Sequence, residues 1–241
     1  MLVVNPKYEY LRSWLEQLPD TFVFRGEVIY DARNQIRLID SGNSYCGKLC
    51  VKRFHCPALP NRIIYSCLRQ PKAKRAYENA RRLEALHIGT PTPVAYLLQE
   101  KRYSLIGESY LITEVSPLKR NFYEFRAHGI EGYEHIIRQF AQFTADLHGK
   151  GVLHKDYSPG NILFDVDAQG NARFELVDIN RMRFGKPVSM RTACRNFCRL
   201  WGKEDFFVLL AEVYAEARGF NKIECRRLTL MYWRRFWRYR K

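Results

Sequence analysis

The chain has 241 residues, of which 46% are hydrophobic and 27% are charged, so its composition excludes a disordered or fibrous protein and allows one or two domains. Its 40 Lys and Arg residues against 25 Asp and Glu residues give a formal net charge of +15, which indicates an anionic partner: nucleic acid, a membrane surface or an acidic substrate. No apolar run reaches the roughly 18 residues of a membrane-spanning helix, and the N-terminus lacks the layout of a signal peptide.

The first half of the chain predicts short strands and two helices. Apolar residues at helical spacing predict a helix over 6–18, ended by Pro19 and Asp20. A basic helix is expected over 71–86. It should end there because Gly89 and the prolines that follow it cannot continue a helix. Strands are predicted over 22–30, 36–39, 49–54, 94–98 and 109–115.

The second half predicts mainly helices, with two short strands over 161–166 and 174–178. Helices are expected over 133–149, from residue 192 onward and over 206–218. The β-rich and helical parts meet near 115–118. The sequence therefore predicts an α+β fold of two lobes, with a small β-rich domain over 1–115, a mainly helical domain over 116–241 and a ligand cleft between them.

The clearest chemical motif runs from His154 to Phe164, between the predicted long helix and a strand. It contains Asp156 and Asn161, and Asp178 follows at the end of the next apolar run. Two carboxylates and an amide suit phosphoryl transfer, since one carboxylate orients the attacking hydroxyl and the other joins the amide in holding Mg²⁺. The order His-x-Asp, four residues, Asn and a later Asp is typical of protein-kinase-like enzymes; the alternative is that His154 and Asp156 only cap a turn.

A kinase-like site also needs a lysine on a strand and a glutamate on a helix. Lys52 is the candidate, since period-two alternation turns it away from the core that Leu49 and Val51 face. It would bind the α- and β-phosphates of ATP. Glu78, in the middle of the basic helix, is its expected partner and Glu84 is the alternative, although either could instead pair with an arginine on the helix surface.

The glycine-rich turn of a kinase is missing before Lys52. The first predicted hairpin, with its turn over 30–34, must then cover the phosphates, but its tip has no glycine to let the backbone approach them. Arg33 and Asn34 are expected to contact the nucleotide with their side chains instead. The same feature motivates a different hypothesis, a catalytically silent pseudokinase that serves as a membrane-binding or assembly module.

The sequence resembles the lipopolysaccharide core kinase (Kdo/WaaP) family, which has a protein-kinase-like fold, and is most similar to its Bacteroides-type members. The resemblance covers nearly the whole chain and rests on several short motifs taken together. They span 5–8, 26–30, 33–34, 51–54, 72–75, 89–96, 154–164 and 177–181.

The resemblance implies ATP-dependent transfer of phosphate to a sugar hydroxyl, of Kdo or heptose, in the inner core of lipopolysaccharide. It implies that Asp156 is the catalytic base, that Asn161 and Asp178 bind Mg²⁺, and that Lys52 binds ATP. The expected cofactor-binding set comprises Lys52, Glu78, Arg33, Asn34 and, at the junction of the lobes, Glu114 and Val115.

The chain departs from protein kinases in ways that argue against a peptide substrate. Ser158 stands where serine/threonine kinases carry a lysine, Ile179 and Asn180 follow Asp178 in place of Phe-Gly, and no Ala-Pro-Glu motif comes after them. A hydroxyl of a small molecule or of a glycan is therefore expected as the acceptor. A protein kinase or another small-molecule kinase of the same fold is the alternative.

The segment 226–241 combines seven basic residues with five aromatic ones and no acid. Such a stretch can lie in the interface of an anionic membrane, which would make this a cytoplasmic protein bound peripherally to the inner membrane. Equally, it can be a helix whose aromatics pack on the second lobe while its arginines stay in water. Nucleic acid is a third possible partner.

The seven cysteines are odd in number and scattered, which indicates reduced cytosolic thiols. Cys194 and Cys198 could share a helix face as a metal-binding pair, but no second close pair completes a four-ligand set. Buried or inert thiols are therefore expected.

Overall fold

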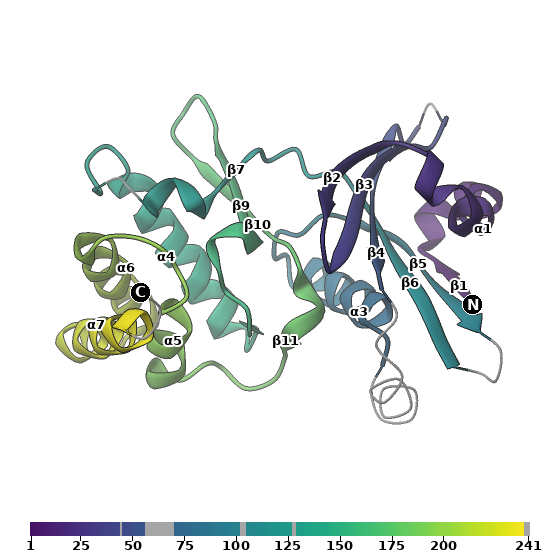
Figure 1. Ribbon diagram of the computed structural model, residues 1–241. Coiled ribbons are helices and arrows are strands. Elements are labelled where there is room, and N and C mark those ends of the chain that lie inside the picture. The colour runs from purple at the N-terminus through teal and green to yellow at the C-terminus, as the bar shows by residue number, and fades with distance from the viewer. Residues whose placement is uncertain (44, 56–69, 102–104, 127–128, 239–241) are drawn as a thin grey trace. The chain divides into compact units, whose positions relative to one another are not determined.

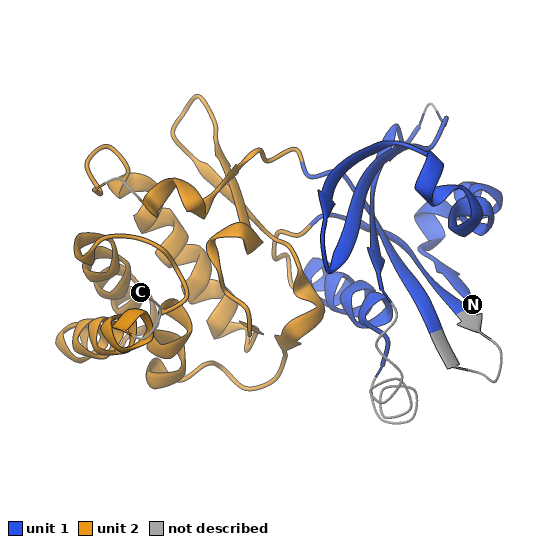
Figure 2. Cartoon of the chain, in the orientation of Figure 1, with its two compact units in different colours: residues 1–85, 91–116 blue, residues 86–90, 117–241 orange. Residues whose placement is uncertain are grey.

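The computed structural model describes residues 1–43, 45–55, 70–101, 105–126 and 129–238. The chain divides into two compact units (Figures 1 and 2). The first unit comprises Met1–Ala85 and Pro91–Ser116, and the second comprises Leu86–Thr90 and Pro117–Lys241.

The short segment Leu86–Thr90 groups with the second unit, although a division at residue 115 would assign it to the first. Leu176 N donates a hydrogen bond to Gly89 O (2.9 Å), and Thr90 Oγ1 donates to Leu176 O (2.9 Å). The backbones approach so closely that a Cβ added at Gly89 would lie 2.0 Å from Phe174 O. The segment is therefore packed into the second unit while the chain on both sides of it belongs to the first.

The first unit is built on a six-stranded antiparallel sheet in the order β1-β5-β6-β4-β3-β2 (Figure 1). The strands are β1 (Leu2–Val4), β2 (Glu27–Asp31), β3 (Asn34–Asp40), β4 (Lys48–Phe54), β5 (Pro93–Lys101) and β6 (Leu105–Glu114). The predicted strands that correspond to β3 through β6 are confirmed with nearly the same bounds. Strand β1 was not predicted, because three residues are too few for a periodic pattern; pairing of Val3 with Tyr96 on β5 holds it.

Helices cover both faces of this sheet. They are the 3₁₀ helices η1 (Pro6–Leu11) and η2 (Phe22–Phe24) and the α-helices α1 (Arg12–Thr21) and α3 (Lys72–Ala85). One core joins α1 to the sheet and includes Leu15, Leu18, Leu49 and Val51. A second core joins α3 to the opposite face and includes Phe54, Ala73, Tyr77 and Tyr96. The alternation along β4 thus sends Val51 to one core and Phe54 to the other.

Two predictions for the first unit are wrong. The N-terminal helix does not end at Pro19, because α1 runs through Thr21; a proline near a helix end removes only one main-chain donor. The segment 22–24 is a 3₁₀ helix rather than a strand, and β2 begins only at Glu27. The change of direction occurs at Gly26, whose φ of 71° favours glycine.

The second unit is mainly helical. Its helices are α4 (Glu134–Gly149), α5 (Met190–Phe197), α6 (Glu204–Arg218), α7 (Lys222–Arg238) and the 3₁₀ helices η3 (Phe122–Arg126), η4 (Pro159–Asn161) and η5 (Ile179–Arg181). One small antiparallel sheet has the order β10 (Ala172–Leu176), β9 (Ile162–Val166), β7 (Arg120–Asn121), and β8 (Leu153–His154) pairs with β11 (Met182–Arg183). The helices and strands predicted for this half are confirmed with nearly the same bounds. None of the helices described here is long and apolar enough to cross a membrane.

A cluster of phenylalanines forms the centre of the second unit. Phe122 contacts Phe140 and Phe164 with ring centroids 4.2 Å and 5.4 Å apart. The buried members of the cluster are Phe122, Phe125, Phe140, Phe164 and Phe174. Because these rings come from η3, α4, β9 and β10, the core supports the chain on both sides of the catalytic motif.

The C-terminal helix α7 packs on the second unit through its aromatic residues. Trp233 contacts Phe207 with ring centroids 4.9 Å apart, and Trp237 contacts Trp201 at 6.0 Å. The described arginines of α7 are exposed. Packed rings and solvated arginines match the second alternative for this segment; its last residues, 239–241, lie outside the described residues.

Helix α4 ends in a left-handed turn at Gly151 that leads into β8 and the predicted catalytic motif. Val152 N donates to Leu147 O and Gly151 N to His148 O, both at 3.1 Å, as in a Schellman motif. Gly151 has a φ of 75°, and an added Cβ would lie 1.8 Å from Gly185 O. We expect Gly151→Ala to lower the free energy of unfolding by about 2–4 kcal/mol, measured by denaturant titration.

The neighbouring residue Gly149 provides the matched control. It is the last residue of α4, and an added Cβ there would meet no atom within 4 Å. Gly149→Ala is expected to leave stability unchanged or to raise it by about 0.5–1 kcal/mol, since alanine favours the helix. Equal destabilisation by the two substitutions would contradict the assigned role of Gly151.

Candidate active site

The predicted catalytic motif folds around a buried histidine. His154 is completely buried; its Nε2 donates to Val177 O (3.1 Å) and its Nδ1 accepts from Asp156 N (3.1 Å). Burial lowers the pKa of His154, and a neutral ring with one donor and one acceptor matches both contacts. His154 thereby links the loop that carries Asp156 to the strand end that leads into Asp178.

Asn161 strengthens the same link. Its Nδ2 donates to Asp156 O (2.9 Å), and its main-chain oxygen accepts from Val177 N (3.0 Å). The first bond fixes the orientation of the amide, so Oδ1 is the atom that can bind a cation. The main chain of Asp156 is therefore held by both His154 and Asn161.

Asp178 follows β10 in a left-handed backbone conformation, with φ 52° and ψ 43°. This region is uncommon for residues with a side chain, and aspartate and asparagine tolerate it best. Asn180 Nδ2 donates to Asp178 Oδ1 (2.6 Å). Backbone strain of this kind often marks a functional position, and here it falls on a predicted metal ligand.

Two ladders bring Asp178 back to the catalytic loop. In the β9–β10 hairpin Leu176 pairs with Ile162, and in the β8–β11 pair Met182 lies opposite His154. The chain on either side of Asp178 is thus hydrogen-bonded to the chain on either side of Asp156. The second unit therefore brings Asp156, Asn161 and Asp178 into one loop cluster.

The side chains in this cluster suit Mg²⁺. Asn161 and Asp178 offer hard oxygen ligands, and Mg²⁺ combines a few of these with water and substrate phosphates. Within the described ranges, no three or more His, Cys, Asp or Glu residues gather as a metal site. Cys194 Sγ instead lies 3.6 Å from Cys225 Sγ, and both thiols are free and buried.

Asp156 has an ionic partner that the sequence analysis missed. Arg199, which follows α5, donates from Nη1 to Asp156 Oδ1 (3.1 Å). Asn196 Nδ2 donates to His154 O (3.0 Å), so the end of α5 is attached to the catalytic loop. No spacing rule connects residues 43 apart in the chain, so only the packed structure could reveal this pair.

Lys52 lies on β4 in the first unit, on the sheet face that α3 covers. Leu49 and Val51 are completely buried on the other face, as the alternation predicted, while Lys52 is half-buried. Lys52 Nζ lies 5.2 Å from the centroid of Phe54, a member of the α3 core. Its role in nucleotide binding stays a prediction.

Apolar side chains that the sequence analysis did not single out surround Lys52 on its face of the sheet. The register pairs Lys52 with Ile36 on β3 and with Leu111 on β6. Residues directly opposite one another share a face, and Leu38 joins them two residues along β3. All three apolar side chains are half-buried, and the period-two pattern of β3 was the signal that could have found Ile36 and Leu38.

The two candidate partners of Lys52 both lie on α3. Glu78 Oε1 is 3.8 Å from Lys74 Nζ, and Glu84 Oε2 is 3.1 Å from Arg81 Nη1. Both pairs follow the helix surface at i,i+4 and i,i+3 spacing. The choice of Glu78 over Glu84 stays a prediction.

The glycine-free turn between β2 and β3 is held by side chains. Gln35 Nε2 donates to Asp31 Oδ2 across the turn (2.8 Å), and Arg53 Nη2 donates to Gln35 Oε1 (3.1 Å). Arg33 is exposed at the tip and Asn34 begins β3. Hydrogen bonds between polar side chains thus stabilise this turn, which has no glycine.

The predicted junction residues lie at the end of β6. Glu114 Oε1 accepts a hydrogen bond from Tyr8 OH (2.6 Å), and Val115 is exposed. Burial and this hydrogen bond raise the pKa of Tyr8, so it remains a protonated donor at neutral pH. The Glu114 side chain is thereby engaged within the first unit.

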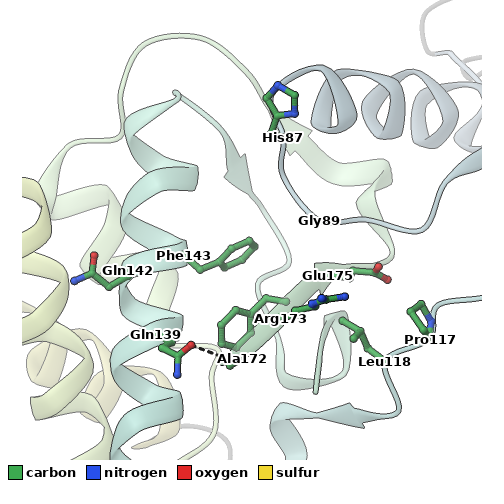
Figure 3. A pocket seen from close by; sticks show the side chains of 11 residues that line it. His87, Gly89, Pro117, Leu118, Gln139, Gln142, Phe143, Ala172, Arg173 and Glu175 are labelled. Carbon is green, nitrogen blue, oxygen red and sulfur yellow. Dashed lines mark hydrogen bonds between the residues drawn. The ribbon is translucent and has the colours of Figure 1, made fainter. Parts of the chain in front are cut away.

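The second unit also contains an open pocket of about 560 Å³ beside α4 and β10 (Figure 3). Phe143, Arg173 and Glu175 are among its lining residues, and Gln139 Oε1 accepts from Ala172 N at its edge (2.7 Å). None of the predicted site residues lines this pocket. The candidate active site therefore rests on the loop cluster rather than on this cavity.

Comparison with known proteins extends these observations. The sequence matches the lipopolysaccharide kinase (Kdo/WaaP) family over residues 33–231. The solved structure "WaaP in complex with acyl carrier protein" is similar over 99% of this chain and 98% of that chain, with a TM-score of 0.66 and 15% sequence identity. This likeness shows the kinase-like fold.

A shorter stretch of 32 residues is 48% identical to the eIF-2-alpha kinase GCN2 of Arabidopsis thaliana. The stretch is 13% of this chain and only 3% of that relative, so the chain spans a small part of its length. The family match, by contrast, extends over most of the chain. The chain belongs to the lipopolysaccharide kinase (Kdo/WaaP) family.

Proposed function

We propose that this kinase transfers the γ-phosphoryl group of ATP to a hydroxyl of Kdo or heptose in the inner core of lipopolysaccharide. The observation that carries the proposal is the loop cluster of Asp156, Asn161 and Asp178, held together around buried His154. The formal charge of +15 also suits an acceptor that bears phosphates and Kdo carboxylates.

Each predicted residue has a role in this proposal. Asp156 accepts the proton of the attacking hydroxyl, and Asn161 and Asp178 hold Mg²⁺, which when bound neutralises charge on the phosphates. Lys52 binds the α- and β-phosphates with Glu78 as its partner. The half-buried apolar face beside Lys52 supports a place for the adenine base. The remaining proposed nucleotide contacts are Arg33, Asn34, Glu114 and Val115.

We place the protein peripherally on the cytoplasmic face of the inner membrane, close to this lipid acceptor. The exposed cations of α7 are Arg226, Arg227, Arg234, Arg235 and Arg238. Three of them pair with glutamates on the exposed surface. Such pairs contribute little to stability, so exchanging them for lipid phosphates costs little.

A direct test is incubation with labelled ATP, Mg²⁺ and truncated lipopolysaccharides that end in Kdo or in heptose. Label is expected on one acceptor, with a mass gain of one phosphate, and more strongly in anionic vesicles than in neutral detergent. Lipopolysaccharide from cells with and without the protein should differ by the same mass. Label on added protein or aminoglycoside and never on lipid would favour another acceptor class.

A catalytically silent family member is the second candidate function. The observation in its favour is the turn at Ala32 and Arg33, which has no glycine to bring the backbone close to phosphates. Such a protein would label no acceptor of any class. Nucleotide binding separates the cases, because a live site must bind ATP in a magnesium-dependent way.

A further inference from the structure

The ion pair between Arg199 and Asp156 engages the carboxylate that the proposed function needs as a base. One oxygen of that carboxylate lies 3.1 Å from the guanidinium, and the two side chains are 38% and 33% exposed. An acceptor hydroxyl that approaches this oxygen must therefore compete with Arg199 for it. Because both side chains are open to solvent, a ligand can reach the pair and exchange its partners.

Arg199 stands next to a group of aromatic rings, here called the aromatic wall: Tyr123, Trp201, Phe236 and Trp237. Ring centroids are 4.8 Å apart between Tyr123 and Trp201, and 6.0 Å apart between Trp201 and Trp237. Arg199 Cζ lies 5.9 Å from the centroid of Phe236. A second guanidinium, that of Arg126, lies 4.6 Å from the centroid of Trp201.

The aromatic wall is attached to the catalytic loop at one end and to α7 at the other. Tyr123 packs so closely on Gly160 that an added Cβ there would lie 2.9 Å from the Tyr123 ring. Gly160 directly precedes Asn161. At the other end, Arg234 Nη2 on α7 donates to both carboxylate oxygens of Glu204 on α6 at 2.8 Å. All these residues belong to the second unit, so the arrangement does not depend on the first.

Aromatic rings beside a guanidinium fit an acidic sugar better than they fit a polyphosphate chain. The apolar face of a sugar ring packs on aromatic rings, and a carboxylate or phosphate binds a guanidinium through two parallel hydrogen bonds. A pair of bonds that uses Arg199 Nη1 takes the donor that now holds Asp156 Oδ1. Binding of the acidic group and release of the carboxylate are therefore one event.

We propose that Arg199 binds the carboxylate or phosphate of the acceptor sugar and that this exchange of ionic partners frees Asp156 to accept the hydroxyl proton. The inference rests on the proposed function for the identity of the acceptor. The inference goes beyond the proposed function because it names a specificity residue and couples recognition of the acceptor to release of the base, Asp156. A neutral sugar cannot complete the exchange and should be a poor acceptor even when its hydroxyl fits.

The test compares Arg199→Gln, Arg199→Lys and the control Arg195→Gln, an exposed arginine one turn earlier on α5. The acceptors are lipid A bearing Kdo and the same lipid with methyl-esterified Kdo carboxylates. We expect Arg199→Gln to raise the KM for the charged lipid about 10- to 100-fold, from the loss of a charged hydrogen bond. The KM for ATP should not change, Arg199→Lys should lie between, and Arg195→Gln should match the wild type.

Esterification adds a double-mutant cycle to these measurements. Esterification should raise the KM of the wild type for the lipid by about the same factor as the Arg199→Gln substitution does. It should have little effect on the KM of the Arg199→Gln variant. Equal effects of esterification on both proteins would overturn the inference, as would equal behaviour of the Arg199→Gln and Arg195→Gln variants. Should Arg199→Gln not fold, Arg199→Lys carries the same comparison.

A binding measurement without turnover separates this inference from the proposed function. Calorimetric titration with free Kdo should give weaker binding for Arg199→Gln than for the wild type. Asp156→Asn should bind Kdo more tightly, since its neutral amide competes less well for Arg199. If the three proteins bind Kdo in this order of affinity but the wild type labels no lipid, the proposed function alone is refuted. If all three proteins bind Kdo with the same affinity, the inference alone is refuted.

Discussion

Replacing Asp156 with Asn is expected to lower turnover about 10²- to 10⁴-fold while magnesium-dependent binding of ATP persists. The amide cannot accept the proton of the acceptor hydroxyl at neutral pH. Its oxygen can still accept the hydrogen bond from Arg199, and the main chain of residue 156 keeps its bonds to His154 and Asn161. Steady-state kinetics with the lipid acceptor, together with an ATP titration of the same protein, measure both quantities.

Asp146→Asn is the matched control for this substitution. Asp146 is an aspartate of the same unit that pairs with Lys150 at 2.7 Å, but its side chain is 56% exposed and lies outside the loop cluster. Its turnover should equal that of the wild type. Normal turnover by Asp156→Asn would show that another group accepts the proton, and an inactive wild type that does not bind ATP would point to the silent family member.

The loop cluster could be predicted because local sequence builds most of it. His154, Asp156 and Asn161 lie within eight residues, and a short loop leaves them few ways to be far apart. Asp178 is more distant in the chain, but β9 and β10 form a hairpin with Leu176 opposite Ile162. A hairpin returns its second strand to the start of its first, so it brings Asp178 back to Asn161.

Arg199 and the aromatic wall could not be predicted, because nothing local connects them with the catalytic motif. Their rings come from η3, from the segment after α5 and from α7. The tail of the chain showed the right composition for both a membrane anchor and a packed helix. Only the contacts of Trp233 and Trp237 with the rest of the unit distinguish the packed state of these rings.

The errors in the first unit have a related cause. Proline reliably breaks a helix when it lies in the middle. Pro19 lies near the end of α1, where burial of the apolar residues Leu18 and Phe22 keeps the chain helical. The packing of this face outweighs the loss of one main-chain donor. Local propensity therefore located the elements of the sheet better than it located the end of the helix on top of it.

The backbone of Asp178 decides which substitution can test its role. Alanine in the left-handed region costs about 1–2 kcal/mol, so a loss of ligand binding by Asp178→Ala could reflect local unfolding. Asparagine tolerates φ near 52° and can still accept the hydrogen bond from Asn180. Asp178→Asn thus removes the charge and keeps the turn.

We expect Asp178→Asn to abolish the magnesium-dependent part of the thermal stabilisation by ATP. At a ligand concentration 100 times the Kd, that stabilisation amounts to about 2.7 kcal/mol, or roughly 5–10 °C in Tm for a chain of this size. Thermal melts with ATP, with and without Mg²⁺, should give two different Tm values for the wild type and for Asp146→Asn, but one value for Asp178→Asn. Melts without ATP and without Mg²⁺ report the stability of the fold itself, so a lower Tm there would show a folding defect. A full magnesium-dependent shift in Asp178→Asn would remove Asp178 from the metal site, and with it the reason for the strained backbone at this position.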